Sequence, residues 1–136
     1  MRNSLSCVSA TLLVLLPFVC LAGRLESLAK AMPFVRSQIR SAPCGYRYYG
    51  TGDSGHWAVQ CSQQVAAALA ILSETPADEL KRAGFRETPE ELRELALSLF
   101  RYSFHTHVTG DADATDGARW GKTWISVLGL ERSSGG

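Results

Sequence analysis

The residues best suited to chemistry are concentrated in the segment 104–132, which holds two histidines, three aspartates and two tryptophans. His105 and His107 are two positions apart, so they face different directions if both lie on a helix. They could ligate one metal ion only after the helix has ended, and no cysteine or carboxylate at zinc spacing completes the set. We interpret them as one core-facing histidine and one helix-end histidine favoured by the helix dipole, and we expect no metal or cofactor.

The aspartates that follow resemble half of a calcium-binding loop. An EF-hand loop beginning at Asp111 needs glycine at its sixth position and glutamate at its twelfth. The chain has Asp116 and Lys122 there instead, which excludes the EF-hand. A calcium site of another kind stays open, beside the simpler interpretation of a turn whose aspartates accept bonds from local N–H groups.

Aromatic side chains are frequent in the expected loops and at the expected helix starts. Tyrosine and tryptophan combine an apolar ring with a polar group, which suits them to stacking on sugars. Trp124, with Ile125 and Leu128 nearby, is expected in the core, whereas Trp120 beside the aspartate loop is expected to face a ligand. The candidate substrate-binding residues are Tyr49, His56, Trp57, His105, His107 and Trp120.

No catalytic residue can be assigned from a motif. The chain lacks the G-x-S-x-G and H-E-x-x-H patterns. A formal G-x-G-x-x-G at 50–55 lacks the strand and βαβ context of a dinucleotide site.

Helices must position these residues, and the apolar spacing predicts several of them. The predicted helices cover 24–40, where Pro33 should bend or split the helix, then 56–73, 76–83, about 89 to 105 or 107, and 121–130. Their predicted ends are caps at Asp53 or Ser54, a cap at Thr75, a stop at Gly84 and a capping box formed by Thr88 and Glu91. The segment 41–55 is predicted to be a loop, and no strand alternation is convincing. The fold is therefore expected to be all-α, with helical hairpins packed antiparallel.

The first 22 residues have the layout of a signal peptide. Arg2 precedes an apolar run from Leu5 to Leu21, with a plausible cleavage site before Gly23. We expect one helical domain over 23–132, a tail without structure at 133–136, and a secreted or periplasmic protein without stable membrane association. An uncleaved membrane anchor is the alternative.

Charge and cysteine content bear on two further properties, nucleic-acid binding and disulfide formation. With 14 Lys and Arg against 13 Asp and Glu the chain is almost neutral, so no basic stripe points to nucleic acid. Cys44 and Cys61 lie outside the signal segment. In an oxidising compartment they could form a disulfide, and two free thiols are the alternative.

Three segments resemble secreted heparinase II/III-like proteins, a class of polysaccharide lyases. They are YGTGDSGHWAVQ at 49–60, RYSFHTHVTG at 101–110 and TDGARWGKTWISVLGLER at 115–132. The resemblance covers about Gly45 to Arg132. It implies the first helical hairpins of an α/α toroid and a uronic-acid-containing polysaccharide as substrate, with tyrosine and histidine sharing the acid–base roles. The family's catalytic residues do not map onto this chain.

Two functions are therefore expected. The first is a truncated N-terminal part of a polysaccharide-degrading protein, inactive alone and lacking its C-terminal part, because the last predicted helix stops after Arg132. The alternative is a small secreted helical protein that binds carbohydrate or protein without enzymatic activity.

Overall fold

The computed structural model describes residues 23–55 and 58–122. The predicted signal segment, the 133–136 tail, nearly all of the helix expected at 121–130, and the candidate residues His56 and Trp57 lie outside the described residues. Within the described part of the chain, no helix has both the length and the apolar character needed to cross a bilayer.

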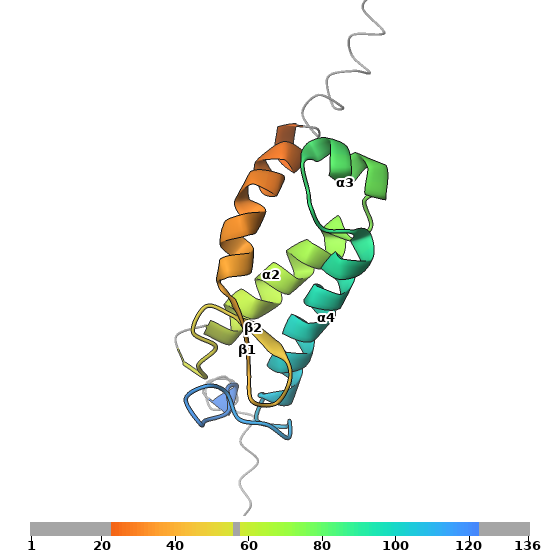
Figure 1. Cartoon of the computed structure of the whole chain (residues 1–136). Coiled ribbons are helices and arrows are strands. Elements are labelled where there is room, and N and C mark those ends of the chain that lie inside the picture. Colours follow the sequence, from red (N-terminus) through yellow and green to blue (C-terminus); the bar gives the residue numbers. More distant parts are fainter. Residues whose placement is uncertain (1–22, 56–57, 123–136) are drawn as a thin grey trace, which may run out of the picture.

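The described residues are mainly helical, as the sequence predicts (Figure 1). A helix over residues 23–37 leads into a two-stranded antiparallel hairpin, and three further helices follow. The named elements are β1 (Ile39–Ser41), β2 (Arg47–Tyr49), α2 (Ala58–Leu72), α3 (Ala77–Ala83) and α4 (Pro89–His105). Figure 1 shows α3 at one end of the molecule, and the hairpin with the chain after α4 at the other end.

Helix α4 begins as the sequence predicts. The Thr88 hydroxyl accepts a hydrogen bond from the Glu91 amide at 3.2 Å, and the Glu91 carboxylate accepts one from the Thr88 amide at 2.9 Å. Pro89 follows the cap, where its missing N–H costs nothing. This capping box satisfies two amides that the helix itself cannot.

Helix α3 is short, at about two turns, and its end was predicted correctly. Gly84 adopts a left-handed conformation with φ 99° and donates its amide to the last carbonyls of the helix. The cap predicted at Thr75 is wrong: Pro76 occupies the cap position, and no side chain caps α3. The helix instead begins with the Pro76 carbonyl accepting from the amides of Glu79 and Leu80.

The main core lies between α2 and α4, which run in opposite directions (Figure 1). Arg93 near the start of α4 pairs with Glu74, just after α2, at 3.1 Å. The apolar i, i+3, i+4, i+7 spacing that begins at Leu92 predicts one buried face for α4, and the structure buries that face. Its buried residues are Leu92, Leu95, Ala96, Leu99, Tyr102 and Ser103. Across from them α2 buries Val59, Ser62, Ala66, Leu69 and Leu72.

The prediction that the chain has no strands is wrong, and residues 47–49 of the segment predicted to be a loop form β2. Ile39 pairs with Tyr49 and Ser41 pairs with Arg47, with the turn closed by the Ala42 amide donating to the Tyr46 carbonyl at 2.8 Å. Each strand has three residues, which is too short to show an alternating pattern. Tertiary contacts stabilise the hairpin instead, because the Ser62 hydroxyl of α2 accepts a bond from the Tyr49 amide at 2.9 Å.

The first helix is shorter than predicted and is not split. It ends at residue 37, and Arg40 lies in β1 rather than in the helix. It continues through Pro33, whose ring removes one backbone donor without ending the element here. Ala29 and Met32 of this helix are buried against the main core.

Candidate functional site

The loops that flank β2, residues 42–46 and 50–55, meet the chain from His105 to Gly121 at the C-terminal end of α4 (Figure 1). We call them together the loop cluster. A second, smaller group of buried residues lies beneath it, namely Ala42, Val59, Tyr102 and Ala114, with Cys44, Tyr46, Tyr48 and Trp120 packed against it. The loop cluster therefore has a core of its own, separate from the main core between the helices.

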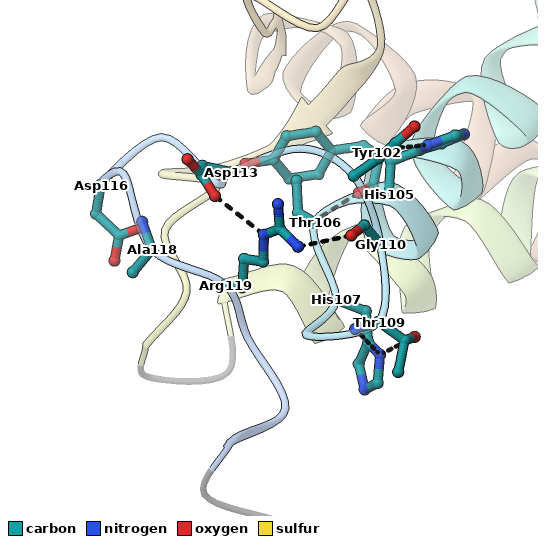
Figure 2. A network of polar contacts seen from close by, with 11 residues as sticks. Tyr102, His105, Thr106, His107, Thr109, Gly110, Asp113, Asp116, Ala118 and Arg119 are labelled. Carbon is teal, nitrogen blue, oxygen red and sulfur yellow. Dashed lines mark hydrogen bonds and ion pairs between the residues drawn. The ribbon is translucent and has the colours of Figure 1, made fainter.

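Tyr102 is the centre of this arrangement (Figure 2). Its side chain is fully buried, and its hydroxyl donates a hydrogen bond to the Gly52 carbonyl. The same hydroxyl accepts a bond from the Thr115 amide at 3.2 Å, so one atom joins both loop segments. Burial disfavours the phenolate and raises the pKa of Tyr102 to about 12.

Two further contacts fasten the segments to one another. The Asp116 carboxylate accepts bonds from the amide and the hydroxyl of Ser54, at 3.1 and 2.7 Å. The Thr115 hydroxyl donates to the Thr51 carbonyl at 2.8 Å. Desolvation raises the pKa of Asp116, but the hydrogen bonds from Ser54 and from the backbone amides of Ala118 and Asp116 together hold that pKa below its ordinary 3.8.

A histidine–aspartate pair lies at the surface of the loop cluster. His105 Nδ1 and Asp111 Oδ1 are 2.5 Å apart, and the hydrogen bond from His105 lowers the pKa of Asp111. The Tyr46 ring stacks on the imidazole with centroids 4.7 Å apart and planes 20° apart. The His105 side chain is 28% exposed, and its Nε2 has no hydrogen-bond partner among the described residues.

His107 lies in a different environment from His105. Its Nδ1 accepts from the Thr109 amide at 3.3 Å and lies 2.8 Å from the Thr109 hydroxyl (Figure 2). The Trp120 ring meets it edge-on, with centroids 4.7 Å apart. A backbone hydrogen bond joins the same two parts of the chain, because the Val108 amide donates to the Trp120 carbonyl at 2.9 Å. The two histidines are thus not brought together to bind one ion.

Arg119 bonds back to residues near the start of the loop that follows α4. Its Nε donates to Asp113 at 3.1 Å, and a terminal nitrogen donates to the Gly110 carbonyl at 2.6 Å (Figure 2). With Arg119 on Asp113, His105 on Asp111 and Ser54 on Asp116, each aspartate of the loop has its own protein partner. In residues 23–55 and 58–122, no three histidine, cysteine or acidic side chains converge as a metal site would require.

The other predicted binding residues are placed as follows. Trp120 is half-buried and uses its indole N–H inside the molecule, donating to the Ser103 carbonyl at 2.7 Å. Tyr49 is half-buried and packs against the main core rather than the loop cluster. Among the described candidates, His105, His107 and Trp120 lie in the loop cluster, and each of them is half-buried.

The thiols of Cys44 and Cys61 are free in the structure, so the disulfide considered from the sequence is not formed. Cys44 is half-buried against the small core of the loop cluster, whereas Cys61 is exposed on α2. Neither of the two predicted caps, Asp53 and Ser54, bonds to an amide of α2 among the described residues. Asp53 accepts from Thr51 and Gly55, and Ser54 bonds to Asp116.

Three important side chains were not assigned a role from the sequence. Tyr102 was predicted only as an apolar position of α4, because helical spacing says nothing about where a hydroxyl points. Asp111 was interpreted through a calcium pattern, although it lies six residues after His105, across a helix end where such a pair can close. Tyr46 was one of several loop aromatics, and no local signal singles it out.

No known protein family, curated protein or solved structure matches this chain.

Proposed function

We propose that this chain forms the first helical hairpins of a secreted or periplasmic, heparinase II/III-like polysaccharide-processing protein, and that its loop cluster binds a uronate-containing polysaccharide. The observation that carries the proposal is the stack of Tyr46 on the paired His105 and Asp111 at the surface. The segment resemblance to heparinase II/III-like proteins supports the same class. No nucleic acid or cofactor enters the proposal.

The chemistry of the pair suits a sugar that carries a carboxylate. An aromatic ring offers an apolar face to the C–H surface of a sugar, while an imidazole offers a directed polar group beside it. His105 Nδ1 donates to the Asp111 carboxylate, which orients the ring. Nε2 then accepts from a ligand hydroxyl in the neutral imidazole, and it donates to a ligand carboxylate in the imidazolium form. The arrangement has the orientation found in acid–base histidines, but no catalytic role is assigned to it.

Exposed apolar side chains are consistent with the proposed toroid architecture. Leu97, Phe100 and Phe104 are at positions i, i+3 and i+7 of α4, and Phe104 is 75% exposed. Phe34 of the first helix and Ile71 of α2 are also largely exposed. In an α/α toroid the neighbouring hairpins would cover such faces, whereas a lone domain would leave them in water.

Binding can be tested with Tyr46→Ala. Titration of the purified chain with heparin oligosaccharides or polygalacturonate, followed by calorimetry, should give saturable binding. We expect Tyr46→Ala to weaken it about tenfold, because the stacking surface is lost. Tyr49→Phe is the matched control, since Tyr49 packs on the main core and should bind like the parent chain.

Circular dichroism should show that both variants keep the helical fold. If the folded parent chain binds no uronate polysaccharide, or if Tyr46→Ala binds as tightly as the parent, the proposal fails. We expect no lyase turnover by the chain alone. Ultraviolet absorbance of an unsaturated product would contradict that part of the proposal.

A further inference from the structure

A groove outside the loop cluster lies between the first helix, the hairpin and α4. It consists of two adjacent hollows of about 240 and about 400 Å³, which share Arg36, Arg47 and Leu95. The smaller hollow is completed by Ile39, Arg40 and Ser41, and the larger by Glu91, Glu94 and Ser98.

The smaller hollow has an unbalanced charge. Three arginines are among the residues that line it, and no acidic residue is. Arg36 is paired with Glu87 at 2.6 Å, whereas Arg40 and Arg47 make no ion pair within residues 23–55 and 58–122. Like charges around one hollow repel each other, so a bound anion would lower the energy of this arrangement.

The hairpin holds these groups in a defined place. Ser41 lies opposite Arg47 in the strand register, and the Arg47 amide donates to the Ser98 hydroxyl of α4 at 3.0 Å. The Ser98 hydroxyl accepts this bond, and its own hydrogen has no acceptor among the described residues. Arg47 is therefore anchored through its backbone, which reduces the ordering cost of a ligand bond.

The acidic residues of the groove lie towards the start of α4. Glu91 and Glu94 line only the larger hollow, and the Glu91 carboxylate is already engaged in the capping box with Thr88. An anion would therefore be attracted to the hairpin end of the groove, where the Ser41 hydroxyl can donate to it and the Ser98 hydroxyl lies in the adjoining hollow.

We infer that the hollow lined by Arg36, Arg40 and Arg47 binds an oxyanion group, a carboxylate or a sulfate. Guanidinium groups suit both, because their parallel N–H donors match two oxygens at once.

The position of the hollow relates it to the loop cluster. Ser98 and His105 are seven residues apart on one face of α4, a rise of about 10 Å, and Arg101 lies between them at helical spacing. The inference that an acidic polysaccharide spans both places rests on the proposed function. The oxyanion site itself does not.

The site is tested first with inorganic sulfate. Titration followed by ¹H–¹⁵N NMR should shift the amides of Ser41, Arg47 and Ser98 in a saturable way. In Arg40→Gln/Arg47→Gln these shifts should disappear. Arg82→Gln removes the same kind of charge from α3, far from the groove, and should behave like the parent chain. Unsaturable shifts, or shifts that survive in the double variant, would overturn the site.

A second experiment distinguishes binding of an acidic saccharide from binding of a free sulfate ion. Heparin oligosaccharides should bind the double variant at least about tenfold more weakly than the parent, because each lost charge-assisted bond is worth about that factor. Equal binding by both would overturn the saccharide extension while leaving the proposed function intact. Saturable sulfate shifts without any polysaccharide binding would sustain the oxyanion site and refute the proposed function.

Discussion

At the scale of single residues, Tyr102 has the greatest effect on the candidate site. Its ring belongs to α4, yet its hydroxyl bonds to the Gly52 carbonyl and the Thr115 amide. The Tyr48 ring packs on it with centroids 5.3 Å apart. A buried polar atom that joins two loops is costly to remove, because its partners stay behind without water.

Tyr102→Phe should therefore destabilise the fold by about 1–3 kcal/mol in urea unfolding. Tyr49→Phe is the control, because no hydrogen bond is formed by the Tyr49 hydroxyl among the described residues, and it should change stability by less than about 0.5 kcal/mol. Equal effects of the two substitutions would contradict the role assigned to the Tyr102 hydroxyl.

The same residue gives a pH dependence with a definite sign. The pKa of Tyr102 is raised from its ordinary 10.0 to about 12 in the folded protein. The protonated phenol is favoured on folding, so its contribution is complete below pH 10 and is lost as pH rises towards 12. The stability difference between the parent and Tyr102→Phe should shrink over that interval, and a constant difference would contradict it.

At the scale of elements, α4 has three distinct faces. One is buried against α2, one carries the exposed Leu97, Phe100 and Phe104, and one carries Ser98 and His105 towards the groove and the loop cluster. The capping box fixes where this helix begins, and so fixes which residues fall on which face.

Thr88→Ala should cost about 1 kcal/mol of stability, measured as a lower urea midpoint with an unchanged slope. Thr75→Ala is the matched control, since Thr75 precedes α3 without capping it, and it should be nearly neutral. A larger loss at position 75 than at position 88 would contradict the observed caps.

The predictable elements are those whose signals are local. The cap at Thr88, the stop at Gly84 and the buried spacing of α4 were found from the sequence. Each of these signals depends on residues that are only a few positions apart in the chain. The hairpin was missed because its three-residue strands depend on Ser62 and Ser98, which are distant in the chain. Tertiary contacts of this kind override weak strand signals.

The site was predictable only as a list of residue types. Tyr46 and His105 are 59 positions apart by their numbers, and spacing along the chain does not reveal that their rings stack. The contacts between Ser54 and Asp116 span 62 positions for the same reason. The sequence therefore pointed to loops that meet in the structure but not to the pairs of residues within them.

At the scale of the whole molecule, apolar surface is exposed on more than one helix. Phe34, Ile71 and Phe104 belong to three different elements and are each mostly exposed. Such surface favours association with other helices, either in a larger protein or between copies.

Phe100→Gln/Phe104→Gln should reduce self-association of the purified chain, measured by light scattering across a concentration series. Because Phe104 is 75% exposed and Phe100 is 40% exposed, the unfolding free energy should change by less than about 1 kcal/mol. Leu99→Ala on the buried face is the contrasting control and should cost about 2–5 kcal/mol. Unchanged association in the double variant would show that this face is not what brings copies together.

The turn after α4 also determines how this site can vary between sequences. A side chain at Gly110 would overlap the His105 carbonyl oxygen, and one at Gly121, where φ is 98°, would lie 2.6 Å from His107 Nε2. Both glycines are sterically required while the histidines keep these positions. Distant relatives that share the turn should therefore be recognisable by two glycines eleven positions apart, even where the surface residues that contact a ligand have diverged.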